Sequence, residues 1–257
     1  MTEHESFPAI LDEVWSKEVH LGLQRENAVL VSTIIKIMGG SVEGKRLLEI
    51  GSGRAVDSLS LAARGAKSYV LDFSSKSLDF STRLARERGI TIVPLRADAR
   101  CLPFAGGSFD LIYSQGLVEH YQPPDKLMEE QVRVVRPGGY VLVDVPQLVS
   151  IQAITKKVLM GMDKWPFGWE RDYTEPQLRK LFEKFGLEVI DLCGWGFRPP
   201  LHMGIRTFLK KFMAQRKKEV SGQGDNDGRV NNEGGSFQNS WFVRHFANCI
   251  GVVGQKL

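Results

Sequence analysis

The sequence has few cysteines and no apolar run long enough to cross a membrane. Cys101, Cys193 and Cys249 are far apart and odd in number, which provides neither a disulfide framework nor a C-x-x-C metal motif. No stretch approaches the ~18 apolar residues that a membrane span needs. The first six residues are acidic and lack the basic and apolar regions of a signal peptide. We therefore expect a cytoplasmic protein in a reducing compartment.

The order of apolar segments predicts an α/β fold. With 257 residues, 42% of them hydrophobic, the chain can bury one sizeable core. Helical stretches are expected near 54–64, 75–88 and 124–135. They alternate with apolar strands near 45–50, 67–71, 90–95, 109–113 and 139–145. This alternation is typical of a doubly wound parallel sheet, as in Rossmann-like folds.

The first strand ends in a glycine loop that lacks the third glycine of the dinucleotide motif G-x-G-x-x-G. The loop reads Gly51-Ser-Gly53-Arg-Ala-Val56, and Glu49 lies two residues before its first glycine. A carboxylate there would repel a pyrophosphate but would attract a cationic ligand. S-adenosylmethionine (SAM) carries both a sulfonium and an ammonium group, so we interpret the loop as a SAM loop.

Two further acids follow the next two strands. Asp72 lies 21 residues after Gly51, the spacing at which an acid accepts hydrogen bonds from ribose hydroxyls. Asp98 follows the third strand, where a carboxylate could accept from the adenine amino group. One strand-end aspartate is more often a helix cap than a ligand. Three acids in register with one glycine turn favour a cofactor site.

Four blocks of the sequence resemble the class I SAM-dependent methyltransferases, and among them the ubiquinone/menaquinone-biosynthesis and small-molecule subgroup. The blocks are Leu48 to Gly53, Val70 to Ser74, Ala97 to Tyr113 and Val135 to Val143. The resemblance covers roughly residues 40–146. It implies a mostly parallel seven-stranded sheet with an antiparallel last strand, here near 248–256. Ala55 departs from the pattern, since many members have a third glycine there, and its extra methyl group should be tolerated.

The resemblance also implies a set of cofactor-binding residues. Gly51 and Gly53 would let the backbone approach the methionine part of SAM, and Asp72 would hold the ribose. Asp98 and the Ala99 N–H would bind adenine, with Ser114 to Gly116 beneath the cofactor. The complete expected set is Glu49, Gly51, Ser52, Gly53, Asp72, Phe73, Asp98, Ala99, Ser114, Gln115 and Gly116. No metal ligand is expected.

The methyltransferase domain is expected to span 41–257, preceded by an N-terminal helical extension over 1–40 that is stopped by Gly39-Gly40. A helix over 174–185, N-capped by Thr174, should lead into a strand over 187–196. Two insertions are expected near the cofactor edge, at 147–173 and 197–247. Within the second, 219–240 has too little apolar content to pack and should be mobile.

The positive charge of the chain is concentrated in its second half. Residues 1–150 hold 17 Lys and Arg against 19 Asp and Glu, while 151–257 hold 17 against 11. Much of the excess lies in 205–218, which places apolar residues at helical spacing beside six basic ones. Such a helix either packs on the body of the protein or contacts anionic lipid. Nucleic acid is a weaker alternative, because no recognition motif accompanies the charge.

The acceptor is inferred from motifs that are missing. Many amino-methylating members have Asp/Asn-Pro-Pro-Tyr/Phe after the fourth strand, where this chain has Ser114-Gln-Gly-Leu. None of the cysteines follows a proline, as the nucleophile for cytosine C5 chemistry would. We therefore expect no nucleic-acid substrate. A hydroxyl, or an activated carbon, of a small, glycosylated or lipid-linked metabolite is favoured.

His120 is the candidate general base, because a histidine can take a proton near neutral pH. A packing or cofactor-side role for His120 remains open. Glu170, Arg171 and Tyr173 are second choices, and Trp165 and Trp169 would form an apolar wall. Two further alternatives remain, a non-catalytic SAM-binding protein and a nicotinamide-dependent oxidoreductase. The sequence leaves the oligomeric state undetermined.

Overall fold

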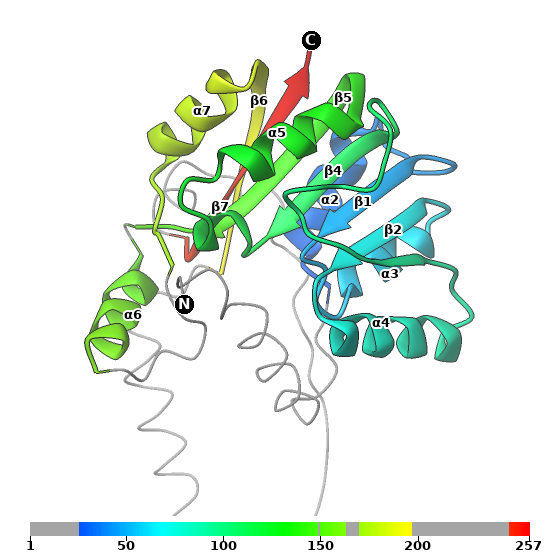
Figure 1. The fold of residues 1–257 in the computed structure, drawn as a ribbon, viewed down its shortest axis with the longest axis horizontal. Helices are drawn as coiled ribbons and strands as arrows, with labels where there is room; N and C mark the ends of the chain where they lie inside the picture. The colour runs from blue at the N-terminus through cyan, green and yellow to red at the C-terminus, as the bar shows by residue number, and fades with distance from the viewer. Residues whose placement is uncertain (1–25, 149, 163–169, 197–246) are drawn as a thin grey trace, which may run out of the picture.

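The computed structural model describes residues 26–148, 150–162, 170–196 and 247–257. Within them, a seven-stranded sheet has the strand order β3-β2-β1-β4-β5-β7-β6 (Figure 1). The strands in chain order are β1 Arg46–Ile50, β2 Lys67–Asp72, β3 Val93–Arg96, β4 Phe109–Gln115, β5 Val135–Pro146, β6 Leu187–Trp195 and β7 Cys249–Lys256. The first five strands pair in parallel, and β7 runs antiparallel to both β5 and β6. The predicted fold class, including the antiparallel last strand, is confirmed.

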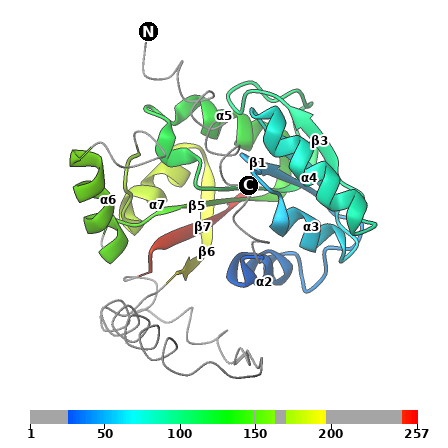
Figure 2. The ribbon, with the colours of Figure 1, turned by 90° about the horizontal axis from the view of Figure 1, so that it is seen from below.

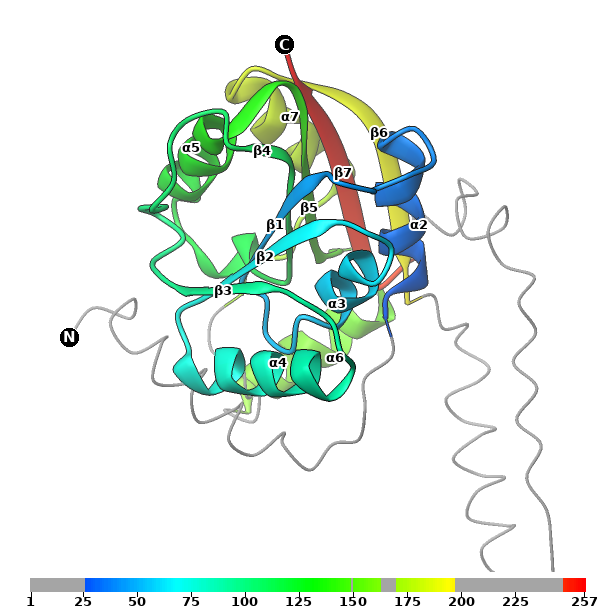
Figure 3. The ribbon, with the colours of Figure 1, turned by 90° about the vertical axis from the view of Figure 1, so that its right-hand side faces the viewer.

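The helices are α2 Ala28–Ile37, α3 Val56–Ala62, α4 Ser75–Glu87, α5 Asp125–Val134, α6 Ile151–Gly161 and α7 Glu175–Lys184, with a short 3-10 turn, η1, at Val118–His120. α2, α3 and α4 cover one face of the sheet, and α5 and α7 cover the other (Figures 2 and 3). α7 begins with the expected Thr174 cap, reinforced by Gln177 in a capping box, which satisfies N–H groups of the first turn.

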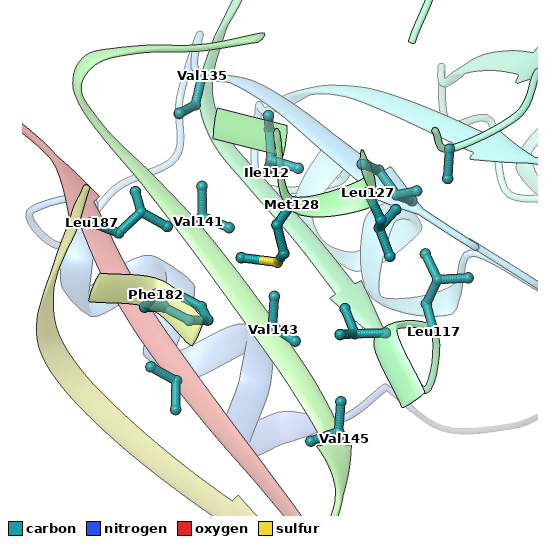
Figure 4. Close-up of a cluster of buried hydrophobic side chains, with 14 of the residues drawn as sticks. Ile112, Leu117, Leu127, Met128, Val135, Val141, Val143, Val145, Phe182 and Leu187 are labelled. Atoms are coloured by element: carbon teal, nitrogen blue, oxygen red, sulfur yellow. The ribbon is translucent and has the colours of Figure 1, made fainter. Parts of the chain in front are cut away.

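The alternation of side chains along β1 divides the core into two layers. Leu48 and Ile50 point into the larger cluster beneath α5 and α7, while Leu47 faces α2 and α3. Figure 4 shows the larger cluster, in which Met128 lies over the β5 valines and Phe182 lies over β7. Because successive strand residues point to opposite faces, Glu49 falls on the side of α3. The alternation of side chains along β1 therefore decides that Glu49 lies next to α3.

Gly254 in β7 has no room for a side chain. A Cβ atom there would lie 2.5 Å from Phe182 Cδ1 and 2.9 Å from Leu187 Cβ, well inside normal contact. The glycine therefore lets α7 pack closely on the last strand.

Part of the predicted organisation falls outside the described residues. This applies to the extension before residue 26, to Trp165 and Trp169, and to the second insertion, including 205–218 and 219–240. Of the first insertion, the structure describes the helix α6 and the stretch from Glu170 to Tyr173, where Gln147 and Tyr173 form a parallel bridge. In Figure 1, α6 lies beyond the end of β5, apart from the two helical layers.

Candidate functional site

The glycine loop lies where β1 meets α3 and is tied to the neighbouring strand. The N–H groups of Gly51 and Ser52 both donate to the Leu71 carbonyl, at 2.8 and 3.1 Å. Gly51 has φ +69°, and a Cβ there would lie 3.0 Å from the Leu117 side chain. The conformation therefore favours glycine, and a larger residue would also require the Leu117 side chain to shift. Ala55, which stands where many family members have a third glycine, adopts φ 52°. The difference from glycine is therefore more than an added methyl group, because the alanine is held in a left-handed conformation.

Asp72, at the end of β2, holds this loop in place. Its Oδ2 accepts hydrogen bonds from the Gly53 N–H at 2.8 Å and from Ser77 Oγ at 3.1 Å. Its Oδ1 accepts from the Ser74 N–H at 2.8 Å. Burial raises the pKa of Asp72 above its usual value, although the bonds from Ser74 and Gly53 oppose the rise. The acid expected to hold the ribose is therefore also the anchor of the glycine loop.

Glu49 is buried beside the first turn of α3. Its Oε2 accepts from Ser58 Oγ at 2.6 Å and from the Tyr113 hydroxyl at 3.2 Å. Burial, together with the nearby charge of Asp57, raises the pKa of Glu49 to about 8. A cation bound next to Glu49 would offset this cost, because an opposite charge favours the ionised form.

Next to the loop, the end of β4 is joined by hydrogen bonds to two residues that sequence reasoning missed, Asn27 and Asp57; we call this group the floor. Gln115 Nε2 donates to Asp57 Oδ2 at 2.6 Å, and Asn27 Nδ2 donates to Gln115 Oε1 at 3.1 Å. The Asn27 N–H completes the triangle by donating to Asp57 Oδ1 at 2.6 Å. Of these two residues, only Asp57 could have been recognised from the sequence. It lies at the start of the helix that follows the glycine loop, a position where a dinucleotide-binding site would not have an acid.

Two buried hydroxyls of the loop and the floor could pair with a polar ligand. Ser52 Oγ in the loop and Ser114 Oγ in the floor have no hydrogen-bond partner within the described ranges of the chain. Buried polar groups are normally paired, so two unpaired hydroxyls at the expected methionine end fit the amino and carboxylate groups of SAM.

The residues predicted to bind adenine lie in a more exposed setting than the glycine loop. Phe73 is 44% exposed, and the Arg96 guanidinium lies 5.6 Å from its ring centre. Asp98 pairs with Arg100, whose Nη2 lies 2.7 Å from Oδ2. The hydrogen bonds from Arg100 lower the pKa of Asp98. Ala99 is buried beside it, and the adenine contacts of Asp98 and Ala99 stay a prediction.

His120 closes the short turn η1, which follows the floor residues. Its side chain is 7% exposed, and Nε2 lies 3.9 Å from Glu170 Oε1. The preceding residue, Glu119, accepts a hydrogen bond from the Arg171 N–H at its main-chain carbonyl. The turn and the stretch from Glu170 to Tyr173, two segments far apart in sequence, are thereby brought together.

A buried lysine, which sequence reasoning also missed, completes this region. Lys156 of α6 is only 3% exposed in its side chain, with Nζ 3.0 Å from Glu170 Oε2 and in contact with Asp172. Burial alone would lower the pKa of Lys156, but the two carboxylates raise it on balance. In sequence, Lys156 is only one of two adjacent lysines on an amphipathic helix.

Within the described residues there is no metal-ligand cluster, and no helix is long and apolar enough to cross a membrane.

Comparisons with known proteins agree with this geometry. A family model described as a methyltransferase domain matches residues 48–143. The ubiquinone biosynthesis O-methyltransferase of Sinorhizobium fredii is 29% identical over 163 residues, which cover 62% of this chain and 66% of that protein. The enzyme of the same name from Aeromonas salmonicida is 28% identical over 209 residues, 77% of this chain and 86% of that protein.

A solved structure supports the fold. The geranyl diphosphate C-methyltransferase of Streptomyces coelicolor, in complex with geranyl diphosphate and S-adenosyl-L-homocysteine, superposes with a TM-score of 0.61 and 11% identity. The superposition covers 90% of this chain and 79% of that one.

Proposed function

The chain belongs to the class I SAM-dependent methyltransferases, and we propose that it transfers the methyl group of SAM to a hydroxyl oxygen of a small acceptor molecule. The family match favours SAM over a nicotinamide cofactor. The observation that carries the choice of oxygen is the burial of His120 directly after the floor of the cofactor site.

SAM, when bound, supplies the methyl group as an electrophile. The residues of this chain that would hold it are Glu49 and Asp72 through their carboxyl groups, and Ser52 and Ser114 through their unpaired hydroxyls. The backbone of the glycine loop, fixed by Asp72, would determine the position of the methionine part. The main task of the protein is then to align the two reactants and exclude water.

A buried histidine favours a hydroxyl acceptor. An alcohol or phenol must lose a proton during the transfer, and a histidine whose side chain is removed from solvent can take it. Glu170, at 3.9 Å from Nε2, would stabilise the imidazolium that results. An amine acceptor would instead use its own lone pair.

The surroundings of His120 support an acceptor with a polar end. Glu119 Oε2 and the Tyr173 hydroxyl are buried without hydrogen-bond partners among the described residues. Both can pair with a hydroxyl-bearing ligand. The relatives are named for O-methylation in ubiquinone biosynthesis. We therefore propose a small, glycosylated or lipid-linked hydroxyl compound, of which an aromatic diol is the simplest probe.

The test is production of S-adenosylhomocysteine by the full chain with SAM and 3,4-dihydroxybenzoate, with mass spectrometry of the methylated product. We expect a methyl ether. Two matched controls are 3,4-dimethoxybenzoate, which has no free ring hydroxyl, and 3,4-diaminobenzoate, which offers nitrogen instead. Transfer to the diamine but not to the diol would overturn the choice of oxygen.

The same assay distinguishes the proposed enzyme from a non-catalytic SAM-binding protein. If calorimetry shows SAM binding while no product forms with aromatic or aliphatic hydroxyl compounds, the methyl-transfer proposal is wrong.

A further inference from the structure

The two oxygens of the Glu170 carboxylate are shared between a lysine and a histidine. Oε2 accepts a hydrogen bond from Lys156 Nζ at 3.0 Å, and Oε1 lies 3.9 Å from His120 Nε2. The side chains of Lys156, Glu170 and His120 are 3%, 6% and 7% exposed. Asp172, also buried, is the second carboxylate on Lys156. The lysine and its two acids thus meet the candidate base away from solvent.

Among the described residues, the other titratable groups near this cluster come from four elements. They are Glu119 of η1, Asp144 of β5, Arg171 and Tyr173 of the stretch before α7, and Cys249 of β7. Burial holds the pKa values of Glu119, Asp144 and Cys249 well above their usual ranges and raises that of Tyr173. Burial thus favours the neutral form of all four groups. Arg171 is exposed, so solvent screens its charge.

Among the described residues, the charges that lie nearest to His120 are those of Lys156, Glu170 and Asp172. Lys156 contributes one positive charge, and Glu170 and Asp172 contribute two negative ones. A negative charge beside an imidazole favours its protonated form, so a proton taken up by His120 would be stabilised here.

We propose that Glu170 is a positioning residue for His120, and that Lys156 and Asp172 set the charge that the imidazole meets. The proposal rests on the proposed function, in which His120 takes the proton of the acceptor hydroxyl. A carboxylate beside Nε2 favours the tautomer that carries its proton there, which leaves Nδ1 as the nitrogen that accepts a proton.

The proton step balances charge within the cluster. The acceptor O–H bond breaks, its proton goes to His120 Nδ1, and its electron pair stays on the oxygen that takes the methyl group. The cluster formed by Lys156, Glu170, Asp172 and His120 then changes from one net negative charge to none. After the product leaves, the proton returns to water.

The test is the titration of His120 itself, followed by NMR in the full chain without SAM. The chain has five histidines, so the His120 signal is assigned as the one missing from H120Q. Removing a nearby negative charge should lower the midpoint by about one pH unit in E170Q, and by less in D172N. K156Q removes the positive charge and should raise the midpoint. E129Q removes an exposed carboxylate from α5 and is the matched control, expected to leave the midpoint unchanged.

Opposite shifts in E170Q and K156Q would support the proposal, since loss of packing alone would not change sign with charge. Unchanged midpoints, or shifts in the same direction, would overturn it. If E170Q does not fold, D172N and K156Q still give the required pair. Because the titration needs no acceptor, its outcome is separate from that of the proposed function. If H120A keeps full methyl-transfer activity while the midpoints shift as stated, the role as base fails and the electrostatic coupling stands.

Discussion

The Asp72 carboxylate accepts a hydrogen bond from the Gly53 N–H at 2.8 Å, so the acid at the end of β2 fixes the loop that the cofactor would contact. Ser77 reinforces this link, because its hydroxyl lies within hydrogen-bond distance of both Asp72 Oδ2 and the Gly53 carbonyl oxygen. A ribose bound to Asp72 would therefore lie directly beside the glycine loop.

Asp72→Ala should weaken SAM binding by roughly 1.5–3 kcal/mol, the range for losing hydrogen bonds to a charged group. It should also lower the free energy of unfolding by about 1–3 kcal/mol, because the Gly53 and Ser74 N–H groups lose their acceptor. Calorimetric titration with SAM and urea unfolding measure the two effects. Asp79→Ala, which removes an exposed acid of α4, is the control. Unchanged affinity in a folded variant would remove Asp72 from the site.

Glu49→Gln should make the cofactor-free protein more stable at pH 7. Because the folded-state pKa of Glu49 is about 8, above its unfolded-state value, ionisation costs stability as the pH rises between the two values. The neutral amide removes a cost of roughly 3 kcal/mol at pH 7. Urea unfolding at pH 5 and pH 8 should show a gap between variant and wild type that widens at the higher pH. A constant gap would mean that Glu49 does not ionise in this range.

The same substitution should weaken SAM binding, because the cationic ligand loses the carboxylate that it would ionise. Calorimetry in buffers of different ionisation enthalpy should detect fewer protons released on binding by Glu49→Gln than by the wild type. Equal affinity and equal proton release would show that SAM does not interact with Glu49.

His120→Ala should lower turnover by about 10²–10⁴-fold, the usual contribution of a general base, with little change in SAM affinity. The wild-type rate should fall as the pH drops through the histidine range, because the protonated imidazole cannot accept a proton. Steady-state assays across pH and calorimetric titration check both parts. A variant that keeps its rate would assign His120 to packing, and one that loses SAM binding would make it a cofactor-side residue.

The segment 205–218, outside the described residues, remains a sequence-based prediction of an amphipathic helix. If it contacts lipid, the protein should co-sediment with anionic vesicles, and added salt should weaken the binding. K210A and K211A together should reduce the binding free energy by about 1 kcal/mol per lysine. K36A and K126A, at exposed lysines of α2 and α5, provide the matched control. No binding at low ionic strength would favour a soluble acceptor.

The sequence by itself determined the sheet, the glycine loop and its acids, because these depend on local patterns. Apolar runs separated by helical stretches predict a parallel sheet, and in such a sheet Glu49, Asp72 and the floor residue Gln115 must gather near one edge. The register of β1 follows from Leu47 and Leu48. The helix that Glu49 faces, however, depends on which helices cover each side of the sheet.

Only the tertiary structure decided which partners these residues have. Asn27 and Asp57 enter the floor through hydrogen bonds that span 88 and 58 residues, and no local pattern encodes such distances. Lys156 meets Glu170 because α6 turns its side chain inward, and a lysine on an amphipathic helix is more often solvated. Charge in the interior depends on the balance of desolvation and pairing, which is set by the packed neighbours and not by the order of residues along the chain.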